Sequence, residues 1–172
     1  MYWKPLDYDK PGRAPLDGSS FLIATPEELL EARWVDDTSH HPELSVSLEG
    51  LTVKEGGNFW LDLWRKTYSG SDVHYWCPLP GSPDGFILAL SEQELRRESL
   101  AINSSSRKDH VTTLVHTKRG WLEAGYDKQA QGWISPGGRL VHPAQVRAGT
   151  VFPRPDKFPF VPRESELAPL WA

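Results

Sequence analysis

A cysteine and a histidine stand three residues apart near the middle of the chain, at Cys77 and His74. A cysteine nucleophile needs an imidazole close enough to generate the thiolate, and hydrogen-bond donors that stabilise the oxyanion. Cys77 follows Tyr75 and Trp76 in a predicted strand, where residues i and i+3 point to opposite faces. Because a buried free cysteine behaves as a small hydrophobic residue, we expect Cys77 to be buried and inert.

A second group of residues with possible chemistry is His40, His41 and Glu43. Zinc takes three or four converging ligands, so a distant histidine would have to complete such a set. The chain has no H-E-x-x-H motif, and its single cysteine excludes any site built from several thiolates. The sequence therefore predicts no metal site and no other cofactor.

Two pairs of neighbouring carboxylates are available for acid–base or binding roles. Glu27 and Glu28 lie at the start of a predicted helix, whose N-terminus favours acidic residues. Asp36 and Asp37 follow that helix in a polar stretch that also holds Glu43, and no capping role accounts for them. Loops on a scaffold are where binding residues concentrate, so we interpret Asp36, Asp37 and Glu43 as partner-binding residues.

Serine-rich and glycine-rich segments carry no catalytic motif. The three serines at 104–106 lack a G-x-S-x-G frame, and Pro136-Gly137-Gly138 is not followed by the Lys-Ser/Thr pair of a phosphate-binding loop. Together with the expectation for Cys77, these observations lead us to predict no catalytic residue.

The tryptophan content is unusual, with eight in 172 residues. Trp60 and Trp64 share one face of a predicted strand with Asp62, while Phe59, Leu61 and Leu63 share the other. Displayed aromatic side chains anchor protein interfaces and also stack on sugars or bases. Trp60 and Trp64 are therefore candidate partner-binding residues, with core packing as the alternative.

Two helices are predicted from their N-terminal signals. Thr25 is a good N-cap with Pro26 at the first helical position and Glu28 completing a capping box, which predicts a helix over 26–34. Ser91 and Glu94 make a second capping box before a helix over 92–100.

Short apolar or alternating runs predict strands between these helices and after them. The predicted strands cover 21–24, 44–48, 51–53, 59–64, 72–79, 86–90, 111–117, 120–126, 131–135 and 139–141. Helices between them are too few and too short for a parallel doubly wound sheet. The predicted fold class is α+β: a mostly antiparallel sheet of about six to eight short strands, two short capped helices and a Pro-rich C-terminal tail.

Length and composition predict a single domain over 1–172. Residues 1–18 are interpreted as an N-terminal arm anchored by aromatic rings, and residues 143–172 as an extended Pro-rich tail. Neither an apolar span of membrane length nor a secretory signal is evident, so we expect a cytoplasmic protein without a membrane partner.

Charge is unevenly distributed along the chain, whose net charge is −4. Residues 1–50 hold ten acidic and four basic residues (−6), whereas residues 101–172 hold six acidic and ten basic residues (+4). A dedicated nucleic-acid binder would show a clear basic excess, so no nucleic-acid partner is expected. The acidic N-terminal part instead predicts one protein partner with a basic surface.

These observations favour a non-catalytic protein-binding domain, and within that class an inhibitor or immunity protein that neutralises a partner enzyme or toxin. The step to an immunity protein is made by analogy of class. Two alternatives stay open. One is a small hydrolase or transferase with a dispersed His/Asp/Cys site, in which His74, His116 or His142 lines a pocket beside an acid. The other is a carbohydrate- or peptide-binding module that uses exposed tryptophans.

Overall fold

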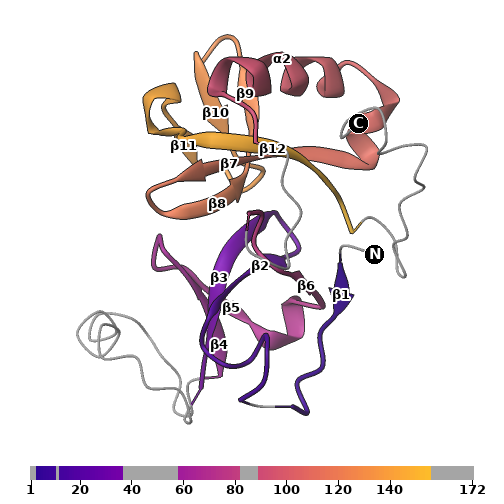
Figure 1. The fold of residues 1–172 in the computed structure, drawn as a ribbon, viewed down its shortest axis with the longest axis vertical. Coiled ribbons are helices and arrows are strands. Elements are labelled where there is room, and N and C mark those ends of the chain that lie inside the picture. Colours follow the sequence, from indigo (N-terminus) through magenta and orange to yellow (C-terminus); the bar gives the residue numbers. More distant parts are fainter. Residues whose placement is uncertain (1–2, 11, 37–57, 82–88, 156–172) are drawn as a thin grey trace.

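The structure is a computed structural model that describes residues 3–10, 12–36, 58–81 and 89–155. Strands dominate the described residues, and their one α-helix is α2 (Glu92–Asn103) (Figure 1). The N-terminal strands are β1 (Lys4–Pro5), β2 (Ser20–Ala24), β3 (Leu29–Val35), β4 (Phe59–Asp62), β5 (Thr67–Ser69) and β6 (Tyr75–Cys77). The C-terminal strands are β7 (Val111–Thr117), β8 (Gly120–Glu123), β9 (Gly125–Asp127), β10 (Gly132–Ile134), β11 (Leu140–Val141) and β12 (Ala148–Pro153). Short 3-10 helices are η2 (Gly70–Asp72), η3 (Ser106–Asp109) and η4 (Pro143–Gln145).

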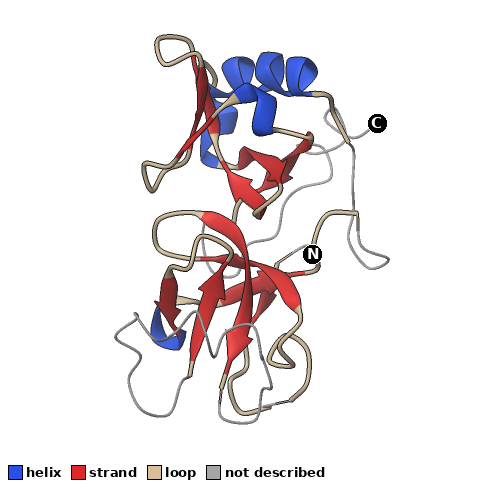
Figure 2. Cartoon of the chain, turned by 90° about the vertical axis from the view of Figure 1, so that its left-hand side faces the viewer, coloured by secondary structure: helices blue, strands red, loops and turns tan. Residues whose placement is uncertain are grey.

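One sheet runs through both halves of the chain in the order β1-β6-β2-β3-β8-β7-β12, and β4 and β5 branch from β3. A second sheet has the order β11-β10-β9, and the strand pairs of both sheets are antiparallel. Figures 1 and 2 show β1 to β6 in the lower half of the molecule, and α2 with β7 to β12 in the upper half. The predicted antiparallel, sheet-rich character is therefore confirmed.

The sheet divides at β3. Leu30 pairs with Leu122 of β8, whereas the rest of the strand, from Ala32 to Val35, pairs with β4. On its other side β3 pairs with β2 from Leu29 to Arg33. The two halves of the molecule thus share a sheet through a single strand-register position, and side chains must supply further contacts between them.

The helix predicted over 26–34 is wrong, because this segment is a turn followed by β3. Thr25 Oγ1 accepts a hydrogen bond from the Glu28 N–H at 3.0 Å, as an N-cap would, but the Thr25 N–H also donates to the Glu28 carbonyl and closes a hairpin. The strand that follows, β3, has buried residues on both faces, and it lies between β2 on one side and β4 and β8 on the other. Burial in the sheet outweighs the local capping signal, since tertiary packing overrides helix propensity.

The second predicted helix is confirmed as α2, which extends three residues beyond its predicted end. Ser91 and Glu94 form the predicted capping box. The buried residues of α2 include Leu95, which packs so closely on β12 that a Cβ on Gly149 would overlap its Cδ2 atom. A glycine is needed at this point of β12 for the helix to lie on the sheet.

The strand predicted over 111–117 is confirmed as β7, with the same bounds. Strand β12 lies inside the segment predicted to be an extended tail from 143, and it pairs with β7 over all of its six residues. The rest of that tail, beyond 155, lies outside the described residues, as do the strands predicted over 44–48 and 51–53. More strands are present than the predicted six to eight, because β1, β3, β5 and β12 were not predicted as strands and the strand predicted over 120–126 is divided into β8 and β9.

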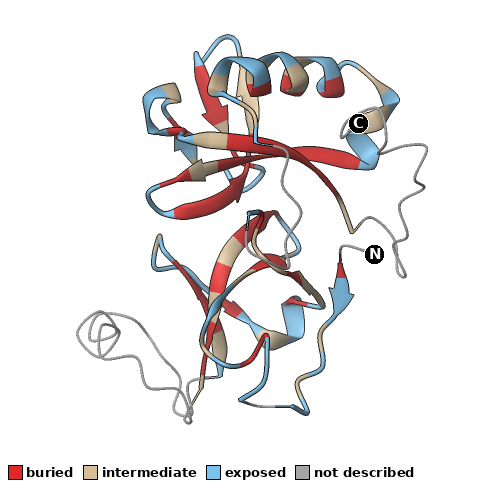
Figure 3. Cartoon of the chain, viewed as in Figure 1, coloured by how far each residue is buried: buried red, intermediate tan, exposed pale blue. Residues whose placement is uncertain are grey.

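Aromatic side chains fill the core and fasten the N-terminal arm. Figure 3 shows that buried residues lie in the strands of both halves. The largest cluster includes Trp34, Trp60 and Trp133. Trp3, from the arm, donates its indole N–H to the Pro153 carbonyl at 2.7 Å and packs edge-on against Phe152. The first and last described strands are thus held by one buried tryptophan. The single-domain organisation over 1–172 remains a prediction.

Candidate functional site

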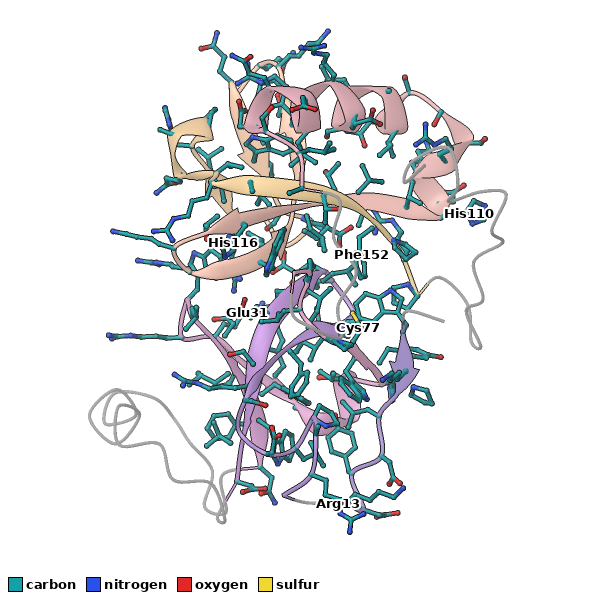
Figure 4. All side chains as sticks on the ribbon, in the orientation of Figure 1. Arg13, Glu31, Cys77, His110, His116 and Phe152 are labelled. Atoms are coloured by element: carbon teal, nitrogen blue, oxygen red, sulfur yellow. The ribbon has the colours of Figure 1, made fainter. Side chains whose placement is uncertain are left out.

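Buried carboxylates lie along the boundary between the two halves, which we call the seam. Glu123 of β8 accepts the Leu29 N–H at 3.1 Å, and Glu31 of β3 accepts the Trp121 N–H at 3.3 Å. Glu28 in the β2–β3 turn accepts the Gly137 N–H at 3.1 Å from the β10–β11 turn. Figure 4 shows Glu31 between the lower and upper halves. These acids extend the interaction of the two halves beyond the one paired position of β3 and β8.

Arg139 neutralises two of the seam acids. Its Nη2 lies 2.8 Å from Asp62 Oδ2, and its Nη1 lies 3.5 Å from Glu28 Oε1. The Asp62 and Glu28 side chains are 0% and 1% exposed, against 18% for Arg139. Burial disfavours the charged guanidinium, but the hydrogen bond and charge of Asp62 outweigh it and raise the pKa of Arg139.

Tyr68 completes this group by donating its hydroxyl to Asp62 Oδ2 at 2.9 Å. Burial and the neighbouring Asp62 charge raise the pKa of Tyr68, so the phenol stays protonated. Arg154 forms an ion pair with Glu123, as Arg139 does with Asp62, and its Nη1 lies 2.6 Å from Glu123 Oε2. Each of these buried acids has an arginine or a main-chain donor as partner, and breaking a buried pair is costly. We therefore interpret the seam as structural.

A pocket of about 480 Å³ opens beside the seam. Its lining includes Glu28, Glu123, Asp72 and His74. His74 is exposed, whereas Cys77 is 1% exposed and does not line this pocket. Burial raises the pKa of the Cys77 thiol, so it remains protonated at neutral pH. The expectation that Cys77 is buried is confirmed, and His74 and Cys77 do not form a nucleophile–base pair.

A second pocket, of about 530 Å³, has a different character. We call it the cationic pocket and define it by Trp64, Lys118, Arg119, Leu140 and Arg147. The three cations are exposed, and none of the lining residues within the described ranges is Asp or Glu. Leu140 is 64% exposed, and the other exposed large hydrophobic residue of the described chain, Leu63, is the sequence neighbour of Trp64. Exposed apolar surface thus lies next to three cations in this pocket, which makes it the candidate surface for binding.

The position of Trp64 follows from the β4–β5 hairpin. Asp62 Oδ1 accepts the N–H groups of Trp64 at 2.8 Å and Lys66 at 2.9 Å. Arg65 takes a left-handed conformation with φ of 65° to close the turn. The Arg139 guanidinium lies 4.8 Å from the centre of the Trp64 ring, in cation–π geometry. The same aspartate therefore serves the seam and fixes the aromatic member of the cationic pocket.

The cations of this pocket lie on ordered backbone. Thr117 Oγ1 accepts the Arg119 N–H at 3.0 Å and donates to the Gly120 carbonyl at 3.1 Å, which orders the β7–β8 turn. The Arg147 N–H donates to the His116 carbonyl at 2.8 Å. Burial and the nearby Arg147 charge lower the pKa of His116, whose ring stacks on Trp121. The positive charges are thus held on short, hydrogen-bonded segments.

The structure separates the five residues predicted to bind a partner. Trp60 is fully buried and donates its indole N–H to the Tyr8 hydroxyl, so it offers no surface, whereas Trp64 lines the cationic pocket. Asp36 is partly buried and accepts the Trp34 indole N–H at 2.9 Å. Asp37 and Glu43 lie outside the described residues, as do His40 and His41. The role of the acidic segment remains a prediction.

Sequence reasoning named Trp64 but missed the other residues that build the two regions. Glu28 was assigned to a helix cap, and that assignment is wrong because its carboxylate binds the Gly137 N–H instead. The excess of basic residues after position 100 was the signal for the cationic pocket. Residues 118, 119 and 147 contribute to this excess, but their convergence depends on the pairing of β7 with β8 and β12.

Comparison of the chain with protein-family models, with curated proteins and with solved structures gives no match. Within the described ranges, no three His, Cys, Asp or Glu side chains are grouped as metal ligands would be. The described helix α2 is too short and too polar to cross a membrane.

Proposed function

We propose that this protein is a non-catalytic protein-binding domain whose partner docks on the cationic pocket. The observation that carries this proposal is the exposure of Leu140 beside Trp64, surrounded by Lys118, Arg119 and Arg147. An aromatic or aliphatic anchor within a charged rim is typical of protein interfaces. The buried acids of the seam, by contrast, are engaged with arginines and main-chain N–H groups.

Within this class, an inhibitor or immunity protein remains the finer proposal. It is supported by the charge asymmetry of the chain, −6 in the first 50 residues and +4 in the last 72. The acidic residues Asp36, Asp37 and Glu43 would then approach a basic part of the partner, while the cationic pocket holds an acidic part.

Affinity capture with the tagged full-length chain in its source cell tests the proposal. We expect one stoichiometric protein partner with the wild type and a loss of at least tenfold with Leu140→Glu. The matched control is Ala101→Glu, which places the same charge on an exposed position of α2. Absence of a stoichiometric partner, or equal loss with both variants, would contradict the proposal.

A second candidate function, a small hydrolase, is favoured by one observation. His74 lines the pocket beside the seam together with Asp72 and Glu28, as a histidine–acid site would require. Purified protein assayed on activated esters and phosphodiesters tests it. Turnover that disappears with His74→Ala and persists with His142→Ala would favour this function over binding alone.

A further inference from the structure

We infer that the cationic pocket binds an extended, acidic segment of the partner, with one apolar side chain against Trp64 and Leu140. This inference rests on the proposed function and names the chemistry of the docked segment.

The first observation is the contrast in charge pairing among the basic residues. Arg139 and Arg154 lie within 2.8 Å of buried carboxylate oxygens. Lys118, Arg119 and Arg147 form no ion pair within the described part of the chain, although they share one pocket. Like charges brought together without counter-charges repel, so a ligand with carboxylates relieves this repulsion on binding.

The second observation is an available strand edge. Strand β11 is the outer strand of the three-stranded sheet, and its register pairs Leu140 with Ile134 and Val141 with Trp133. The Ser135 N–H donates to the Arg139 carbonyl at 2.9 Å, so positions 135 and 139 form a hydrogen-bonded pair. Hydrogen-bonded and non-hydrogen-bonded pairs alternate in antiparallel sheets, so the Leu140 main-chain groups point away from β10. No described strand pairs with that side, which is the geometry used when an extended peptide adds to a sheet.

The third observation is the apolar surface beside this edge. Leu140 exposes 64% of its surface and Trp64 is half-buried. Side chains of an extended peptide alternate between two faces, so one face can place an apolar residue on Trp64 and Leu140 while the other presents acids. The ordered turns that carry Lys118, Arg119 and Arg147 reduce the entropy lost on binding.

A nucleic acid fits these features less well. Single-stranded nucleic acids bind several stacked aromatic rings along a basic groove, whereas Trp64 is the one aromatic residue among the described lining residues. Aliphatic residues Leu140, Val141 and Ala144 provide the remaining apolar lining, and the whole chain is acidic. The pocket therefore matches an acidic polypeptide segment.

The test places a photo-cross-linking phenylalanine analogue at position 140 of the full chain in its source cell. Mass spectrometry then identifies the molecule and the segment attached to this position. We expect a protein segment with an excess of Asp and Glu around an apolar residue. The cross-link should fall at least tenfold when Arg119→Glu and Arg147→Glu are added, and it should persist with Arg97→Glu and Lys128→Glu, which change exposed cations outside the pocket.

The other outcomes separate this inference from the proposed function. A cross-linked segment that is basic or neutral, or a cross-linked nucleic acid, overturns the inference. If the wild type captures a protein partner but position 140 gives no cross-link, the partner docks elsewhere: the inference and the placement of the partner on the cationic pocket then fail, while protein binding itself stands. If neither capture nor cross-linking yields a protein, the proposed function fails with it.

Discussion

The seam and the cationic pocket use the same kinds of charged side chains in opposite ways. In the seam, Asp62, Glu28 and Glu123 are at most 2% exposed and each lies near an arginine. In the pocket, Lys118, Arg119 and Arg147 are exposed and have no acid among the described lining residues. Charges that are buried and paired belong to the fold, whereas clustered charges of one sign on the surface are available to a partner. Asp62 links the two regions because its carboxylate serves both Arg139 and the turn that carries Trp64.

The largest expected change in the free energy of unfolding comes from removing Asp62, the acid that links the seam to the cationic pocket. Asp62→Ala leaves Arg139 without its closest carboxylate and frees the N–H groups of the β4–β5 turn. Breaking a buried pair costs about 3 to 5 kcal/mol, and we expect about 3 kcal/mol because Arg139 is 18% exposed. Urea unfolding measures this change in the free energy of unfolding.

Glu27→Ala is the matched control for Asp62→Ala. Glu27 pairs with Lys66 at 3.5 Å, but the two side chains are 59% and 48% exposed. Exposed pairs contribute about 0 to 1 kcal/mol, so the control should unfold almost as the wild type does. Equal destabilisation by the two variants would show that burial does not distinguish the seam from surface pairs.

A smaller effect, of opposite sign, is expected at the turn that presents Trp64. Arg65 has a φ of 65°, a conformation that glycine adopts without steric cost. Arg65→Gly should therefore raise the free energy of unfolding by about 1 kcal/mol. Thermal unfolding checks this, with Lys66→Gly as a control that should not stabilise the protein.

The smallest effect is expected at Glu31, the half-buried acid of the seam. Burial raises the pKa of Glu31 in the folded protein, although its hydrogen bond from the Trp121 N–H lowers it in part. A raised folded pKa means that the stability contributed by protonation is present at low pH and is lost as pH rises through that pKa. Glu31→Gln keeps an acceptor for Trp121 and should be more stable than the wild type at pH 7 but not at pH 3. Urea unfolding at both pH values tests this, and a stability difference that does not change with pH would contradict it.

Local sequence patterns predicted much of the sheet. They also predicted α2, whose capping box and buried face agree with each other. Ser91 and Glu94 cap α2 because the following residues place Leu95 and Ile102 on one buried face. Thr25 makes the same first hydrogen bond, but Leu29 to Val35 is buried on both faces in a sheet. The Thr25 capping pattern therefore predicted a hydrogen bond that does form. It could not predict that the following residues would be a strand, because that depends on pairing with strands that are distant in sequence.

The candidate site was much less predictable than the fold. Trp64 was named from the alternation of its strand, but Trp60 on the same predicted face is in the core. Alternation assigns residues to faces and cannot show where a strand ends, and β4 ends at Asp62 before Trp64. Leu140 and Arg147 reach the pocket from segments that sequence reasoning assigned to a minor strand and a tail.

The most direct test compares charge reversal in the cationic pocket with charge reversal elsewhere, measured on the same protein preparations. Arg119→Glu with Arg147→Glu is compared with Arg97→Glu with Lys128→Glu, since all four residues are exposed cations. Surface changes of this kind alter stability by about 0.5 kcal/mol or less, so both double variants should unfold in urea like the wild type. We expect partner capture to fall at least tenfold in the pocket variant and to stay unchanged in the control. Unchanged capture by a folded pocket variant, or its destabilisation by more than about 2 kcal/mol, would contradict the assignment of the pocket to binding and of the seam to stability.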